Sequence, residues 1–169
     1  MFPETPRTPA TLYFTEFSSP IGSIQLHGTD AALMGVFMET HRHQPAAPRD
    51  AVRDASPLRT ARTELEEYFA GERREFAVPL EPVGTTFQQR VWQALREIPY
   101  GTTISYGEIA RRIGQPRASR AVGLANGRNP ISIIVPCHRV IGATGTLTGY
   151  GGGLDRKRFL LALESGSAK

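Results

Sequence analysis

The sequence predicts an α+β fold in two halves, an antiparallel sheet followed by a helical part that contains a helix-turn-helix. Alternating apolar and polar runs lie between residues 11 and 37, whereas helical periodicity dominates after residue 57. Residues 72–84 contain prolines and join an acidic half of the chain to a basic half. We therefore expect a first domain over residues 1–83 and a second over residues 84–169.

Three short strands are expected in the first half. The runs at residues 11–17, 22–27 and 32–37 alternate apolar and polar side chains, which indicates an antiparallel meander. Residues 41–57 contain prolines and no apolar period, so they predict a mobile loop. No constellation of chemically active residues occurs in this half.

Two amphipathic helices follow. Residues 57–70 carry apolar positions opposite an acidic face, and Gly71 is placed to end that helix. Thr85 can cap a second helix, which ends before Pro99. Trp92 lies on the apolar side of this helix, so we expect it in the core.

A helix-turn-helix is predicted next. Ser105 and Glu108 have the spacing of a capping box at the start of a helix over residues 105–113. The glycine-containing turn at residues 114–116 leads to a second helix over residues 117–126. In this motif the second helix normally enters DNA.

The second helix of this motif is rich in small side chains. Small residues let a helix approach a narrow groove closely, although they also mark ordinary helix packing. Arg120 is the exception, because a long cation on a face of small residues could reach into the base stack. The small residues are Ala118, Ser119, Ala121, Gly123 and Ala125.

Charge divides unevenly along the chain. Residues 1–83 carry 8 Arg and 12 Asp or Glu, a net charge of −4, whereas residues 84–169 carry 12 Lys or Arg and 4 Asp or Glu, a net charge of +8. Such a basic half favours a polyanionic partner, although it could be only a solvated helix surface. Most of these cations cluster at Arg111, Arg112, Arg117, Arg120, Arg128 and Arg139, with Arg156, Lys157 and Arg158 further on.

Cys137 is the only cysteine, and it follows the apolar run at residues 131–135, so the thiol should end a buried segment. A free thiol titrates near ~8.5 and needs a base to become a nucleophile. His138 can supply that base, with a carboxylate elsewhere to orient the imidazole. The alternative is that Cys137 is a small buried apolar residue and His138 a satisfied neighbour.

A single sulfur excludes an internal disulfide, a redox pair and a thiolate-rich zinc site, and the four histidines lack the spacing of a metal site. We therefore expect no metal and no cofactor. The N-terminus lacks a signal peptide and no apolar run reaches membrane-spanning length, so a cytoplasmic protein without membrane contact is expected.

Several spaced motifs resemble the O6-alkylguanine-DNA alkyltransferases, which repair DNA by direct reversal. The resemblance is specific over residues 85–165 and looser before, where the strand and helix pattern fits the family's ribonuclease-H-like subdomain. The motifs are Arg120-Ala121-Val122-Gly123, Asn129-Pro130, Pro136-Cys137-His138-Arg139-Val140 and Tyr150-Gly151-Gly152-Gly153.

The resemblance implies catalytic roles for five residues. Cys137 would accept the alkyl group, and His138 would take the thiol proton through a water. Glu164 would orient the imidazole, and Asn129 would stabilise the turn that carries the cysteine. Tyr106 would present its hydroxyl to the departing base.

The resemblance also implies how DNA is bound. The second helix of the helix-turn-helix would lie in the minor groove of duplex DNA, and Arg120 would fill the stack that a flipped nucleotide leaves. Further DNA contacts would come from Arg117, Ser119, Ala121 and Gly123. The substrate pocket would be lined by Pro136, Val140, Tyr150 and Gly151, the last replacing the serine of some relatives.

The expected activity is a single transfer of a methyl or alkyl group from O6-alkylguanine, and from O4-alkylthymine, in double-stranded DNA to Cys137. No second thiol could restore the alkylated cysteine. A monomer without zinc and without a transcriptional switch is expected. The alternatives are a lesion-binding or regulatory helix-turn-helix protein without chemistry, and a cysteine hydrolase.

Overall fold

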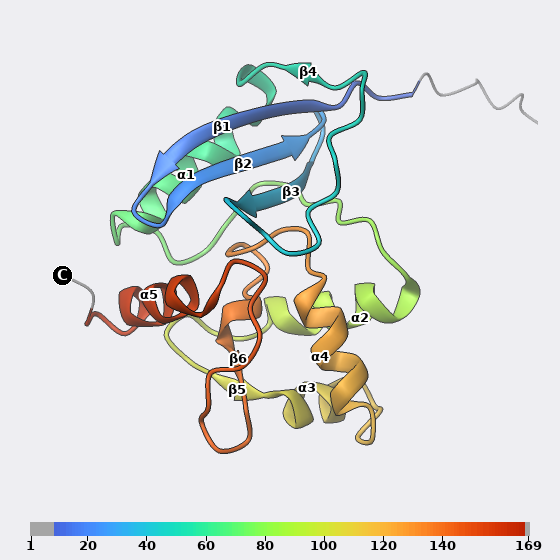
Figure 1. Ribbon diagram of the computed structural model, residues 1–169, viewed down its shortest axis with the longest axis vertical. Helices are drawn as coiled ribbons and strands as arrows, with labels where there is room; N and C mark the ends of the chain where they lie inside the picture. The colour runs from blue at the N-terminus through green and yellow to red at the C-terminus, as the bar shows by residue number, and fades with distance from the viewer. Residues whose placement is uncertain (1–8, 168–169) are drawn as a thin grey trace, which may run out of the picture.

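The computed structural model describes residues 9–167, with a sheet part and a helical part stacked along the long axis (Figure 1). Strands β1 (Tyr13–Ser19), β2 (Gly22–Gly28) and β3 (Leu33–Met38) form the antiparallel meander that alternation predicts. A fourth strand, β4 (Val52–Arg53), completes a sheet of order β3-β2-β1-β4.

Strand β4 lies inside the segment 41–57, which we expected to be loop throughout. Val52 pairs with Tyr13 of β1 in parallel register, and the amide of Asp54 donates to the carbonyl of Phe14 at 3.1 Å. Two exposed residues are too few to show the alternation of apolar and polar side chains that predicts a strand. This strand is recognised only by its backbone pairing with β1.

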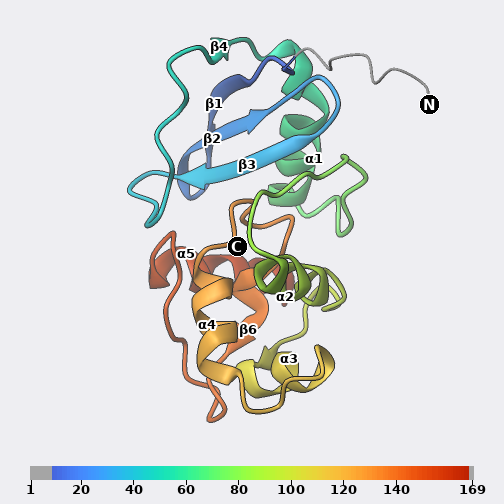
Figure 2. The same ribbon diagram turned by 90° about the vertical axis from the view of Figure 1, so that its right-hand side faces the viewer.

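Helix α1 (Arg59–Phe69) covers one face of the sheet (Figure 2) and follows a short 3₁₀ turn, η1 (Ser56–Leu58). Its apolar side, with Leu65 fully buried, packs toward β1, which confirms the predicted amphipathic helix. Gly71 follows its end with φ of +77°, a conformation that glycine adopts without strain.

Helix α2 (Thr86–Arg96) begins at the predicted cap. The Thr85 hydroxyl accepts from the amide of Gln88, and the Gln88 side chain accepts from the amide of Thr85. Trp92 is 2% exposed, and its indole N–H donates to the carbonyl of Ala125 at 2.9 Å. Trp92 is therefore a core residue, as expected.

The helix-turn-helix is present as α3 (Tyr106–Arg112) and α4 (Ser119–Gly127). The turn contains Gly114 at φ of +74°. Helix α4 starts two residues later than expected, so Arg117 lies in the turn and is exposed.

Only half of the predicted capping box forms at α3. The Ser105 hydroxyl accepts from the amide of Glu108 at 3.1 Å. The Glu108 carboxylate turns away from Ser105 and binds Arg111 at 2.8 Å and Arg112 at 3.2 Å. Hydrogen bonds from two guanidinium groups are charge-assisted and therefore stronger than the single bond that the backbone amide of Ser105 could donate to Glu108.

The chain ends with a short parallel pair and a last helix. Strands β5 (Ile104–Ser105) and β6 (Val140–Ile141) pair directly after η2 (Cys137–Arg139), and α5 (Leu154–Glu164) contacts η2. In the described part of the chain, no helix is long and apolar enough to cross a membrane.

The two halves share one hydrophobic core. The amide of Val36 in β3 donates to the carbonyl of Pro130 at 2.9 Å, and the amide of Ser132 donates to the carbonyl of Val36 at 3.4 Å. The segment that leads to Cys137 therefore lies against the edge of the N-terminal sheet. The domain boundary between residues 83 and 84 stays a prediction.

Candidate active site

The segment before Cys137 is a buried turn that Asn129 holds. The Asn129 side chain donates to the carbonyl of Val135 at 2.8 Å and accepts from the amide of Ile131 at 3.0 Å. Within this turn Ile133 has φ of +73°, which costs a β-branched residue on the order of 1–3 kcal/mol. Asn129 thus stabilises a bent backbone that the apolar run alone does not explain.

Cys137 lies at the end of this turn and is 4% exposed. Burial raises the pKa of its thiol, and Asn129 and the charge of Lys157 offset this only in part. The thiol is therefore protonated at neutral pH, and a base must remove its proton before the sulfur can attack.

His138 is fully buried and has one occupied ring nitrogen. Nε2 donates to Oε1 of Glu164 at 2.6 Å, an assignment made from the carboxylate partner, while Nδ1 has no hydrogen-bond partner within the described residues. Burial lowers the pKa of His138, and Glu164 offsets this only in part, so the ring is neutral at pH 7. Nδ1 is therefore the nitrogen that can accept a proton.

Glu164 receives hydrogen bonds from three side chains. Besides His138, its carboxylate accepts from Arg139 at 2.9 Å through both Nε and Nη2, and from the hydroxyl of Tyr68 at 2.8 Å. Burial raises its pKa, but the bonds from His138 and Arg139 outweigh burial and hold the pKa at about 2. Glu164 is therefore charged at neutral pH and can stabilise an imidazolium.

Two cations that we had assigned to the basic surface are buried. Arg139 is 6% exposed, and besides Glu164 it donates to the carbonyl of Ile98 at 2.7 Å. Lys157 is fully buried and donates to the carbonyls of Val140 at 2.7 Å and Thr148 at 2.9 Å. The expectation was wrong here because counting charges along a sequence does not reveal which ones have buried partners.

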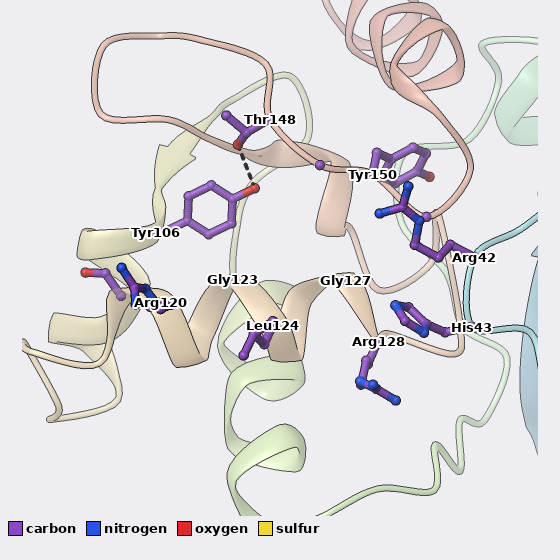
Figure 3. A pocket seen from close by; sticks show the side chains of 13 residues that line it. Arg42, His43, Tyr106, Arg120, Gly123, Leu124, Gly127, Arg128, Thr148 and Tyr150 are labelled. Atoms are coloured by element: carbon purple, nitrogen blue, oxygen red, sulfur yellow. Dashed lines mark hydrogen bonds between the residues drawn. The ribbon is translucent and has the colours of Figure 1, made fainter.

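A pocket of about 650 Å³ opens beside α4 (Figure 3). Five residues predicted to bind DNA or substrate line it together with Tyr106. These six are Tyr106, Ser119, Arg120, Gly123, Tyr150 and Gly151, and the others are Arg42, His43, Leu124, Gly127, Arg128, Thr148 and Gly149.

Two expected pocket residues lie elsewhere. Val140 is fully buried and Pro136 lines a different cavity, beside Tyr100 and Arg139. They flank the 3₁₀ turn η2, which begins at Cys137 and whose three residues are all buried.

The pocket and the thiol are separated in this structure. Cys137 does not line the pocket, whereas Tyr150, which is 9% exposed, does. Burial raises the pKa of the Tyr150 hydroxyl, and a thiolate at Cys137 would raise this pKa further.

Tyr106 presents its hydroxyl at one end of the pocket. The Thr148 hydroxyl donates to the Tyr106 oxygen at 3.1 Å, which leaves the phenolic proton available for another acceptor (Figure 3). The Tyr106 ring packs beside Gly123, where an added Cβ would lie 3.8 Å from the ring. Ala121, by contrast, is exposed on α4 and does not line the pocket.

Sequence reasoning missed several residues of the site, among them Tyr68, Asn126 and Arg42. Tyr68 follows Leu65 by three positions in α1, so its pattern resembles ordinary core packing. Asn126 is buried in α4, and its side chain donates to the carbonyl of Cys137 at 3.4 Å. Arg42 belongs to the acidic half and to a segment without periodicity, so nothing in the sequence signals its place in the pocket.

The fold and this site define a class of protein that joins a helix-turn-helix to a buried cysteine–histidine–glutamate arrangement. Two family models match the chain. The ribonuclease-like domain of 6-O-methylguanine DNA methyltransferase matches residues 12–82, and its DNA-binding domain matches residues 86–166. The chain belongs to the 6-O-methylguanine DNA methyltransferase family.

Individual relatives agree with this assignment. A methylated-DNA–protein-cysteine methyltransferase from Methanosarcina acetivorans is 56% identical over 153 residues, 90% of this chain and 98% of the relative. A protein of the same name from Mycobacterium tuberculosis is 54% identical over 157 residues, 93% of this chain and 94% of the relative. The crystal structure of Mycobacterium tuberculosis OGT in complex with DNA superposes with a TM-score of 0.86 at 53% identity, covering 92% of this chain and 94% of that chain.

Proposed function

We propose that this protein repairs DNA by transferring a methyl or other alkyl group from O6 of guanine to Sγ of Cys137. The observation that carries the proposal is the contact between His138 and Glu164 beside the only cysteine of the chain. In a family named for transfer to a protein cysteine, the acceptor in this chain can only be Cys137.

The first step activates the thiol. Nδ1 of His138 takes the proton of Cys137 through a water, and the resulting imidazolium is stabilised by the charged Glu164. The thiolate then attacks the alkyl carbon in line, so that an S–C bond forms while the C–O bond to guanine breaks. The departing guanine carries negative charge, which the free phenolic proton of Tyr106 neutralises.

The substrate reaches the pocket by base flipping. Helix α4 lies in the minor groove of duplex DNA, where its small residues Ser119, Ala121 and Gly123 permit close approach. Arg120 occupies the vacated position in the base stack, and Arg117 contacts the backbone near the start of α4. O4-alkylthymine presents its alkyl group in a similar way and is a second substrate.

The reaction stops after one equivalent. A thioether has no group that a second nucleophile readily displaces, and the chain has no other thiol to accept the alkyl group. The protein acts as a monomer in the cytoplasm, without a metal or cofactor.

The test uses duplex DNA that carries a radiolabelled O6-methylguanine. One equivalent of label on Cys137 supports the proposal, with mass spectrometry locating it. Label on another residue, or repeated turnover, would contradict it. The variant Cys137→Ser should bind the same DNA without taking up label, whereas a regulatory or hydrolytic protein would show no methyl transfer from the wild type either.

A further inference from the structure

The pocket beside α4 is lined by arginines at both ends. Figure 3 shows Arg120 near the start of α4, and Arg42, His43 and Arg128 near its end. No carboxylate is among the pocket's lining residues in the described chain. Within residues 9–167, none of the three arginines forms an ion pair with a carboxylate.

Arg42 comes from the N-terminal half and is held over the pocket by its own backbone. Its amide donates to the carbonyl of Gly151 at 2.9 Å. The neighbouring His41 packs tightly on the same glycine, because a Cβ at Gly151 would lie 2.7 Å from Nε2 of His41. The side chain of Arg42 therefore starts from a fixed point at the rim of the pocket.

Arg156 links the segment just before Arg42 to the loop that carries Tyr150 and Gly151. Its guanidinium donates to the carbonyl of Glu39 at 2.6 Å, to the carbonyl of Gly152 at 3.0 Å, and to the carbonyl of Ile21 at 2.9 Å. The first and last of these belong to the N-terminal half, and Gly152 belongs to the loop that carries Tyr150. The segment that carries Arg42 is therefore held beside the pocket by the backbone hydrogen bond to Gly151 and by the side-chain hydrogen bonds of Arg156.

We propose that Arg42 and Arg128 form a phosphate-binding site that holds the DNA backbone beside the flipped nucleotide. A nucleotide turned into the pocket brings the phosphates on both of its sides to the rim, and Arg120 stands at only one end. A guanidinium suits bidentate contact with phosphate, and an unpaired one loses no existing ion pair when it binds. DNA binding then involves both halves of the protein, including the half with net negative charge. The proposal rests on the DNA repair function proposed above.

The experiment measures affinity for a short duplex with one O6-methylguanine as a function of salt, in a Cys137→Ser background that cannot react. Loss of one phosphate contact flattens the slope of log K against log salt by about 0.9. We expect this flattening for Arg42→Ala and for Arg128→Ala, with affinity about threefold to tenfold weaker at ~0.1 M salt. Arg42→Lys keeps the charge and should keep most of the slope.

The matched control is Arg59→Ala, because Arg59 is exposed on α1 of the same half and does not line the pocket. This variant should show the same slope of log K against log salt as the Cys137→Ser protein. An unchanged slope in Arg42→Ala would overturn the phosphate site. In the reactive protein with Cys137 intact, Arg42→Ala should leave the rate with free O6-benzylguanine unchanged, because this substrate has no phosphate. A fall in that rate as large as the fall with duplex DNA would also overturn the phosphate site, since Arg42 would then act through its loop. Failure of the wild type to alkylate Cys137 would instead refute the proposed function and leaves the binding measurement intact.

Discussion

Nε2 of His138 donates a hydrogen bond of 2.6 Å to Oε1 of Glu164, and both side chains are at most 1% exposed. The two residues lie 26 positions apart, on η2 and on α5. This bond fixes the ring so that Nδ1 is left as the proton acceptor. In the proposed reaction, activation of Cys137 therefore depends on a residue of the last helix.

Replacing Glu164 with glutamine should slow alkyl transfer by about 10²-fold. The amide keeps the shape of the side chain but removes the charge that stabilises the imidazolium, so His138 accepts the thiol proton less readily. Single-turnover rates with methylated duplex measure the effect. Asp155→Asn is the control, because Asp155 is fully exposed on the same helix and its one ion pair among residues 9–167 is with Arg158. Equal rates for wild type and Glu164→Gln would contradict the assigned role.

Stability should fall in acid through the same carboxylate. The pKa of Glu164 is about 2 in the folded protein, below the value of 4.5 for an unperturbed glutamate. Its contribution is thus fully present above about pH 4.5 and is lost as the pH falls toward 2. The difference in pKa corresponds to about 3 kcal/mol.

Urea unfolding at a series of pH values measures this loss. Wild-type protein should lose more free energy of unfolding between pH 5 and pH 2 than Glu164→Gln, which has no carboxylate to protonate. If the free energy of unfolding falls by the same amount in both proteins, protonation of Glu164 is not the cause of the loss of stability in acid.

Adding a methyl group at Gly151 should destabilise the protein by about 1–3 kcal/mol, because the new Cβ would overlap the ring of His41. Truncating His41 to alanine in the same chain should recover most of that loss. A double-mutant cycle of unfolding free energies measures the coupling between the two positions. Gly149→Ala is the matched control, since a Cβ at Gly149 has open space around it. If the changes in unfolding free energy of Gly151→Ala and His41→Ala are additive, the new Cβ does not clash with the His41 ring.

Replacing Arg120 with alanine should weaken repair of duplex DNA more than reaction with free O6-benzylguanine. A free base has no stack to fill, so only the duplex reaction needs the side chain that replaces the flipped nucleotide. The ratio of the two second-order rate constants measures this selectivity. Arg158→Ala, on the exposed face of α5, serves as the control. Equal losses on both substrates would contradict the proposed insertion.

Much of the fold follows from short-range patterns in the sequence. Alternation over six or seven residues identifies β1, β2 and β3, and the Thr85 cap marks the start of α2. The single cysteine next to His138 also marks the centre of the candidate site. These features depend on local backbone geometry and on residues close together in the chain, so they can be predicted from the sequence.

The remaining features depend on which distant segments meet. Arg139 and Lys157 read as surface cations, yet packing buries them against Glu164 and against backbone carbonyls, where desolvation makes such partners necessary. Likewise Arg42 reaches the pocket only because its loop binds Gly151. The sequence by itself determined strands β1 to β3, helices α1 to α4 and the position of the candidate nucleophile. Tertiary structure alone decided which charges are buried, which nitrogen of His138 has no partner among the described residues, and which residues line the pocket, because burial and long-range contacts depend on the packed chain.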